Sequence, residues 1–177
     1  MSIRFVPSVL AVFFTFSCFF PATAAVKDTA HDAFTIQEDV TVAASPEKAY
    51  DRFVTIGRWW DSDHTFSGDA AHLTIDAAAG GCFCEVLKNG SVEHMRVVFA
   101  SRGALLRLKG GLGPLQGTGD GILTVAFVAA GGGTSVSLTY RVWGYSPGGL
   151  ENDASAVDGV LGQQLTRYRD FVAANPS

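Results

Sequence analysis

The chain has 177 residues, of which 47% are hydrophobic, and its 17 acidic and 13 basic side chains give a net charge of −4. This length suits one domain with a single core. The excess of acidic residues, with Lys and Arg scattered along the chain, excludes a basic patch of the kind that binds nucleic acid.

The first 24 residues have the features of a secretory signal peptide. Arg4 precedes an apolar run from Phe5 to Phe20, and small residues follow at Ala22-Thr23-Ala24. This order predicts cleavage before Ala25, or one residue later, and removal of residues 1–24 from 177 leaves 153. We therefore predict a periplasmic or secreted protein with no stable membrane insertion after cleavage.

Two other interpretations of this segment stay open. A membrane-spanning helix needs roughly 20 apolar residues, but this run is shorter and contains Pro7. The second interpretation is lipidation of Cys18. The residues Thr15-Phe16-Ser17-Cys18, however, lack the leucine that usually begins a lipidation motif. Beyond the cleavage site we expect residues 25–33 to be a disordered tether and residues 34–177 to be a single domain.

The rest of the chain alternates between strand-like and helix-like patterns. Apolar residues at every second position of residues 34–42 predict a strand, and Ser45-Pro46 begins a helix that reaches about residue 54. After a polar loop, six runs bounded by turn residues predict strands: 72–77, 81–87, 92–100, 105–109, 121–129 and 134–144. Apolar residues at helical spacing over residues 150–174, with Leu161 in the middle of the stripe, predict a long amphipathic helix.

This order of elements predicts an α+β fold of the helix-grip type, with a seven-stranded curved antiparallel sheet around a long C-terminal helix. The sequence resembles the SRPBCC superfamily, also called START-like or polyketide-cyclase-like. The resemblance rests on residues 40–50, on Trp59-Trp60, and on Gly80-Gly81-x-Phe83-x-Glu85 followed by Asn89-Gly90. Within that superfamily the chain is similar to the branch named after an activator of the heat-shock chaperone ATPase.

The resemblance implies a cavity between the long helix and the concave face of the sheet, which suits an apolar or aromatic small molecule. Seven aromatic residues are candidates to line it, and each is also an ordinary core residue: Trp59, Trp60, Phe66, Phe83, Trp143, Tyr145 and Tyr168. We therefore predict an exported protein that binds a small hydrophobic molecule and needs no cofactor. Folds of this kind also host cyclases and chaperone cofactors, so the fold does not fix the function.

A polar group could add chemistry to such a cavity. Asn89-Gly90 predicts a two-residue hairpin turn, and the register that follows from it places Glu85 opposite His94 and Phe83 opposite Arg96. Glu85, His94 and Arg96 would then share one face, where they could orient a ligand carboxylate or act as an acid–base group. The alternative function is therefore a cyclase- or hydratase-like enzyme. A solvated cluster of salt bridges is the simpler interpretation.

The opposite face of the same hairpin would carry Cys82, Cys84 and Met95, whose sulfur atoms make a weak candidate metal site. Residues i and i+2 of a regular strand lie roughly 6.6 Å apart, so we expect no disulfide between the two cysteines. The run Asp61-Ser62-Asp63-His64 could hold a metal or transfer a proton. The glycine-rich residues 110–117 lack the features of a phosphate-binding loop, and we expect them to connect two strands at the cavity mouth.

Overall fold

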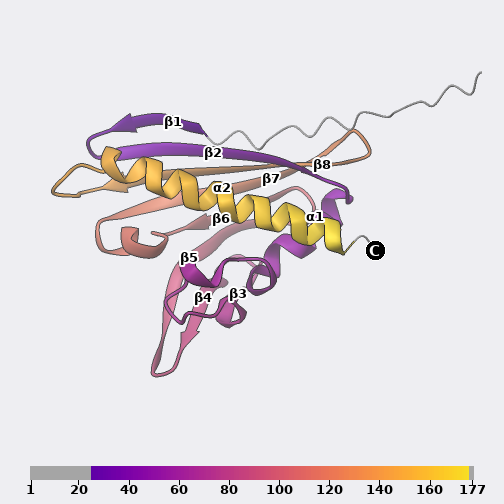
Figure 1. Cartoon of the computed structure of the whole chain (residues 1–177), viewed down its shortest axis with the longest axis horizontal. Coiled ribbons are helices and arrows are strands. Elements are labelled where there is room, and N and C mark those ends of the chain that lie inside the picture. The colour runs from indigo at the N-terminus through magenta and orange to yellow at the C-terminus, as the bar shows by residue number, and fades with distance from the viewer. Residues whose placement is uncertain (1–24, 176–177) are drawn as a thin grey trace, which may run out of the picture.

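The computed structural model describes residues 25–175, so the predicted signal peptide lies outside the described part of the chain. These residues form an antiparallel sheet whose one face is crossed by a long helix (Figure 1). The strands are β1 (Ala25–Ala30), β2 (Ala33–Val42), β3 (Leu73–Ile75), β4 (Cys82–Leu87), β5 (Gly90–Ser101), β6 (Leu105–Lys109), β7 (Gly119–Ala130) and β8 (Gly133–Gly144). The helices are α1 (Pro46–Val54) and α2 (Glu151–Ala174), with short 3₁₀ helices at Ile56–Arg58, Ser62–His64, Ala70–His72 and Gly113–Gly117.

The order of the strands confirms the predicted helix-grip architecture and adds one strand to it. The sheet runs β1-β2-β8-β7-β6-β5-β4-β3 and does not close, because β1 and β3 lie at its two edges. The additional strand is β1, so the expectation of a disordered tether over residues 25–33 is wrong. These residues pair with β2 through backbone hydrogen bonds, for example Ala30 with Ala33. Their side chains are exposed, which is why the sequence carries no alternating pattern there.

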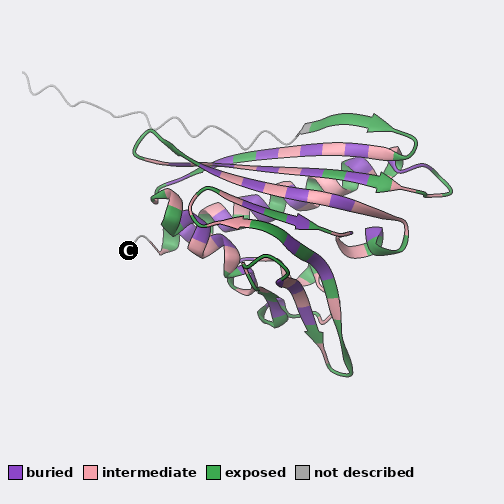
Figure 2. Ribbon diagram, turned by 180° about the vertical axis from the view of Figure 1, so that it is seen from behind, coloured by how far each residue is buried: buried purple, intermediate pink, exposed green. Residues whose placement is uncertain are grey.

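Helix α1 begins where the sequence predicts, because the Ser45 side chain accepts a hydrogen bond from the backbone N–H of Lys48 and Pro46 occupies the first turn. Helix α2 buries the predicted stripe, and Leu161 is only 2% exposed. The hydroxyl of Tyr168 donates to the carbonyl of Ala49 at 2.8 Å and so ties α2 to α1. Seen from behind, the long strands alternate between buried and more exposed residues (Figure 2), as expected for a sheet with one covered face.

The β4–β5 hairpin differs from the predicted register. Its turn lies at residues 88 and 89, so that Leu87 pairs with Gly90, and Glu85 lies opposite Val92 rather than His94. A β-bulge between Phe83 and Cys84 then leaves an additional residue on β5, and Phe83 pairs with Met95. A bulge re-aims the side chains beside it. In this hairpin it turns both His94 and its neighbour Met95 towards the covered face, where both are buried.

Cys82 and Cys84 are joined by a disulfide, contrary to the prediction. Their Cα atoms are 5.3 Å apart, within the range that a bridge allows. The bulge at this point of the hairpin increases the local twist, so the spacing of a regular strand does not apply. Met95 lies on the covered face, away from the two cysteines, and the three sulfur atoms do not assemble. Within residues 25–175, no group of three or more His, Cys, Asp or Glu side chains is arranged to hold a metal ion.

Helix length and polarity bear on membrane insertion. Neither helix of the described chain combines the length and apolar character needed to cross a bilayer.

Candidate functional site

A cavity of about 580 Å³ lies between the N-terminal half of α2 and the covered face of the sheet. This volume is in the range of small-molecule sites. Four parts of the chain line it, and most of the side chains they supply are apolar. These are α2 (Asp153, Ala156, Val157, Val160, Leu161), strands β3 to β5 (Leu73, Phe83, His94), the loop after α1 (Trp60, Asp63, His64, Thr65, Phe66), and the segments around β7 and β8 (Leu112, Gly113, Pro114, Leu115, Thr118, Ser146).

The structure brings three of the seven predicted aromatic residues to this cavity: Trp60, Phe66 and Phe83. Trp59 and Tyr168 are buried core residues beside it, and the indole N–H of Trp59 donates to the carbonyl of Phe53 at 3.1 Å. Two candidates lie elsewhere on the surface: Trp143 is 42% exposed and Tyr145 is 76% exposed. The aromatic lining is therefore concentrated where the loop after α1 meets β4 and β5.

Glu85 and His94 form a buried pair at this point of the wall. The Nε2 atom of His94 lies 2.9 Å from Oε2 of Glu85, and Glu85 is completely buried. The carboxylate also accepts hydrogen bonds from the backbone N–H groups of Phe66 and Ser67. Burial by itself would raise the pKa of Glu85, but the hydrogen bonds from Ser67, Phe66 and His94 outweigh it and hold the pKa below its usual value. Glu85 is therefore an anion at neutral pH.

This anion fixes the orientation of the imidazole. In the neutral ring, an Nε2–H group that donates to Glu85 leaves Nδ1 as the hydrogen-bond acceptor. His94 is 6% exposed, and its Nδ1 atom is buried without a hydrogen-bond partner. The ring packs between Phe66, whose centroid is 5.8 Å away, and Phe83, at 4.9 Å. His94 thus has a fixed ring in the cavity wall, with one nitrogen paired to Glu85 and the other, Nδ1, buried without a partner.

Arg96 does not join this pair, although the sequence predicted that it would. The residue follows the bulge and pairs with Cys82, so its side chain lies on the outer face and is half exposed. There it forms an ion pair with Glu93 and donates to the carbonyl of Gly80 at 2.9 Å. Of the predicted polar trio, the structure therefore assembles Glu85 and His94 alone.

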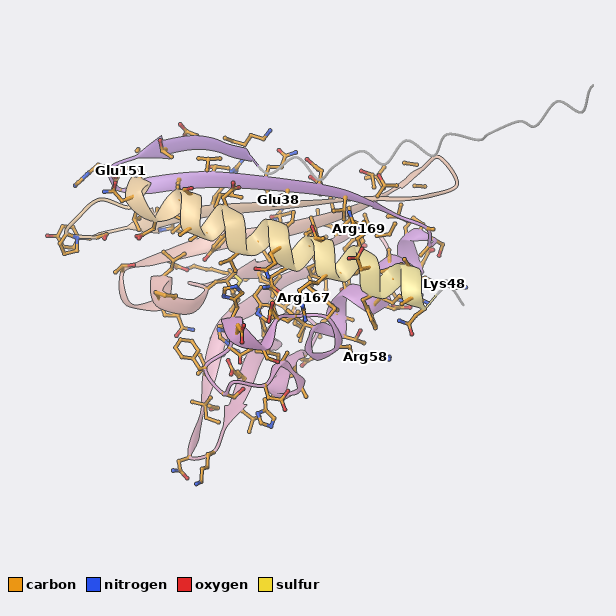
Figure 3. The ribbon with its side chains drawn as sticks, in the orientation of Figure 1. Glu38, Lys48, Arg58, Glu151, Arg167 and Arg169 are labelled. Atoms are coloured by element: carbon orange, nitrogen blue, oxygen red, sulfur yellow. A yellow bond between two sulfur atoms is a disulfide. The ribbon has the colours of Figure 1, made fainter. Side chains whose placement is uncertain are left out.

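The residues of the acidic loop Asp61-Ser62-Asp63-His64 have two roles: Asp61 holds the loop to α2, and Asp63 and His64 line the cavity. Asp61 fastens the loop to α2: its backbone N–H donates to the side chain of Gln164 at 2.8 Å, and its carboxylate lies 3.5 Å from Arg167. Arg167 reaches this loop from α2 (Figure 3) and also donates to the carbonyl of Trp59 at 3.1 Å. Asp63 and His64 lie on the cavity wall, so they do not form a site together with Asp61.

The glycine-rich connection between β6 and β7 lies at the cavity, as predicted. The Tyr140 hydroxyl holds it, because it donates to the carbonyl of Gly110 and accepts from the backbone N–H of Leu112, both at 3.1 Å. Gly110 has a φ of 148°, and a Cβ atom there would lie 2.6 Å from the carbonyl oxygen of His94. Only glycine lets this connection pass so close to β5, directly behind the histidine.

Asp153 was not identified from the sequence as a residue of the cavity. Asp153 lines the cavity from the first turn of α2. It lies one helical turn before Val157, which also lines the cavity, and this spacing is the signal that could have identified it.

The fold is an α+β helix-grip arrangement, in which an open antiparallel sheet carries a long C-terminal helix across one face. No protein-family profile matches the chain, and no curated protein matches its sequence. An uncharacterised protein from Rhizobium leguminosarum is similar in structure, with a TM-score of 0.60 and 16% identity over 87% of this chain and 99% of the other.

Two further solved structures share the fold. CalU16 from Micromonospora echinospora has a TM-score of 0.58 and 14% identity, over 88% of this chain and 86% of its own. The Aha1 dimer from Colwellia psychrerythraea has a TM-score of 0.56 and 17% identity, over 78% of this chain and 95% of its own. At these identities the likeness establishes the fold, and the function has to be argued from the cavity.

Proposed function

We propose that this protein binds a small, largely apolar molecule in the cavity beneath α2. The observation that carries the proposal is the cavity itself, which combines a volume of about 580 Å³ with a mainly aliphatic and aromatic lining and a few polar groups. Sites for small molecules have this composition because apolar contact supplies affinity while a few polar groups fix the orientation of the ligand.

Titration with the neutral apolar dye N-phenyl-1-naphthylamine tests this function. We expect saturable binding, and Trp60→Ala should weaken it by about tenfold or more because a large lining surface is lost. His94→Ala should weaken it less. Trp143→Ala is the matched control, since it removes the same side chain from the surface away from the cavity. Equal losses in the two tryptophan variants would contradict binding in this cavity.

A second candidate function is an enzyme of the cyclase or hydratase kind. The observation that favours it is the Glu85–His94 pair, in which a buried anion orients an imidazole in the cavity wall, an arrangement typical of acid–base groups. Glu85→Gln and His94→Ala should then each reduce turnover of a substrate by about 100-fold or more. A survey of substrates that can be cyclised, hydrated or hydrolysed, run with the native protein and both variants, distinguishes an enzyme from a carrier.

We also propose that the protein acts in the periplasm or outside the cell. The support is the sequence of residues 1–24, with Arg4, the apolar run and the small residues at Ala22-Thr23-Ala24. The mass of the protein recovered from its own compartment tests this proposal, and we expect a chain that begins at Ala25 or Val26. A chain that retains residues 1–24 would contradict export, and a lipid-modified chain that begins at Cys18 would contradict cleavage before Ala25.

The branch of the superfamily is a further proposal. Residues 40–50 and Trp59-Trp60 resemble the branch named after the chaperone-ATPase activator, and the Aha1 dimer shares the fold. A chaperone interaction predicts a complex with an ATP-dependent chaperone, which co-purification with such a chaperone would detect. We favour the small-molecule function because export, as proposed, would separate the protein from cytosolic chaperones.

A further inference from the structure

The carboxylates that line the cavity have no Lys or Arg beside them in the described lining. Asp63 and Asp153 both line it, whereas none of the described residues that line it is a Lys or Arg. Within residues 25–175, neither carboxylate takes part in an ion pair. Arg167, a cation on the same helix, is engaged with Asp61. The cavity therefore presents negative charge that the protein does not neutralise.

A buried polar pair in the wall adds to this negative charge. His94 lines the cavity and is 6% exposed, its Nε2 atom lies 2.9 Å from the buried carboxylate of Glu85, and its Nδ1 atom has no hydrogen-bond partner. A ligand group that meets Asp63 and Asp153 has to donate hydrogen bonds, because ionised carboxylates only accept them.

We infer that the ligand is an amphiphile with an apolar body and a protonated amine, and that Asp63 and Asp153 select it over acids. This inference rests on the proposed function and adds the chemical class of the ligand to it. The apolar body would contact Trp60 and Phe83, and the ammonium group would donate to the carboxylates. An alkyl ammonium group keeps its proton at neutral pH, and its hydrogen bonds to a carboxylate are stronger than those between neutral groups. A ligand carboxylate, in contrast, would be repelled.

Three ligands that share one hydrocarbon body test the inference: 4-phenylbutylamine, 4-phenylbutan-1-ol and 4-phenylbutanoic acid. Each competes with N-phenyl-1-naphthylamine for the purified protein at about pH 7.5 and low salt. We expect the amine to bind about tenfold or more tightly than the acid, with the alcohol between them. The preference should shrink as salt is added, because salt screens the partly exposed charges.

Substitutions test whether Asp63 and Asp153 cause the preference for the amine. In the double variant Asp63→Asn and Asp153→Asn, the affinity ratio of amine to alcohol should fall to within about twofold, and the alcohol serves as the internal reference for folding. Asp170→Asn is the matched control: it removes one charge from the far end of α2, where Asp170 pairs with Arg169, and should retain the preference.

The outcomes separate the inference from the function on which it rests. Absence of saturable dye binding would overturn both. Dye binding together with equal or tighter binding of the acid would overturn the inference alone. A preference for the amine that survives in the double variant would overturn the assignment to Asp63 and Asp153.

Discussion

The carboxyl group of Glu38 lies between β2 and α2 (Figure 3) and is completely buried. Asp158 of α2 faces it, and the hydrogen bond between the two carboxyl groups requires that Glu38 keeps its proton. One turn further along α2, a Cβ atom at Gly162 would lie 3.1 Å from Oε1 of Glu38, so the helix passes close above this group. Burial and the negative charge of Asp158 raise the pKa of Glu38 to about 7.

This raised pKa predicts that the protein loses stability as the pH rises from about 4.5 to 7. Below 4.5, the usual pKa of glutamate, the folded and unfolded chains both carry the proton. Between the two values the unfolded chain releases it while the folded chain retains it, so unfolding becomes easier as pH increases. The loss levels off above about pH 7 and amounts to at most about 3.5 kcal/mol, at about 1.4 kcal/mol per pKa unit.

Glu38→Gln removes the ionisable group and retains its shape. Chemical denaturation across this pH range should show that the free energy of unfolding of the variant rises relative to that of the native protein as pH increases. The difference between the two proteins should reach its maximum near pH 8. Asp28→Asn is the control, since Asp28 is an exposed acid on β1 that is not among the groups raising the pKa of Glu38. Parallel curves for native protein and Glu38→Gln would show that Glu38 is not a protonated buried acid.

At the scale of elements, α2 is the part on which both the core and the cavity depend. Leu161 is buried near the middle of this helix and also lines the cavity. Leu161→Ala should lower the free energy of unfolding by about 2–5 kcal/mol, because it removes buried methyl groups and enlarges the space beneath the helix. Ser155→Ala, at an exposed position of α2, should change it by less than about 0.5 kcal/mol. Similar small effects at both positions, measured by denaturation, would mean that α2 does not pack as described.

The disulfide on β4 predicts a clear result in a thiol assay. Alkylation of the denatured protein without reductant should label neither Cys82 nor Cys84, and both should react after reduction. Because the bridge closes a very short loop, its reduction should lower the free energy of unfolding by only about 1–2 kcal/mol. Labelling of both thiols without reductant would contradict the bridge.

The same hairpin shows where sequence reasoning succeeds and where it does not. The strands other than β1, the helices α1 and α2, and the helix-grip order follow from periodicity and turn residues, because burial of one face imposes those patterns. The bulge beside Phe83 has no such pattern, since one additional residue changes no composition. It nevertheless decides that His94 faces the cavity, that Arg96 does not, and that the cysteines approach each other. The sequence thus allowed the prediction that Glu85 and His94 lie in the site, but it did not allow prediction of the β4–β5 register that places them there.

At the scale of the whole molecule, the open sheet has to protect its edges. Strand β1 covers one edge of β2 although its own side chains are exposed, so its contribution is backbone pairing. A chain that begins at His31 would leave β2, with its alternating apolar residues, as an unprotected edge strand. Such edges pair with other chains. We therefore expect the truncated protein to self-associate at concentrations where the chain that begins at Ala25 does not, as measured by light scattering. Equal behaviour of the two chains would contradict a protective role for β1.

The pairing of β2 with β8 brings together strands that are far apart in the sequence, with Ala33 beside Trp143. The β4–β5 and β7–β8 hairpins can form locally, but the sheet has no continuous core until β8 and α2 have joined it. Topologies dominated by such distant contacts fold slowly, in milliseconds to seconds. The position of β2 beside β8 thus makes the moment of folding, as well as the final shape, depend on β8 and α2.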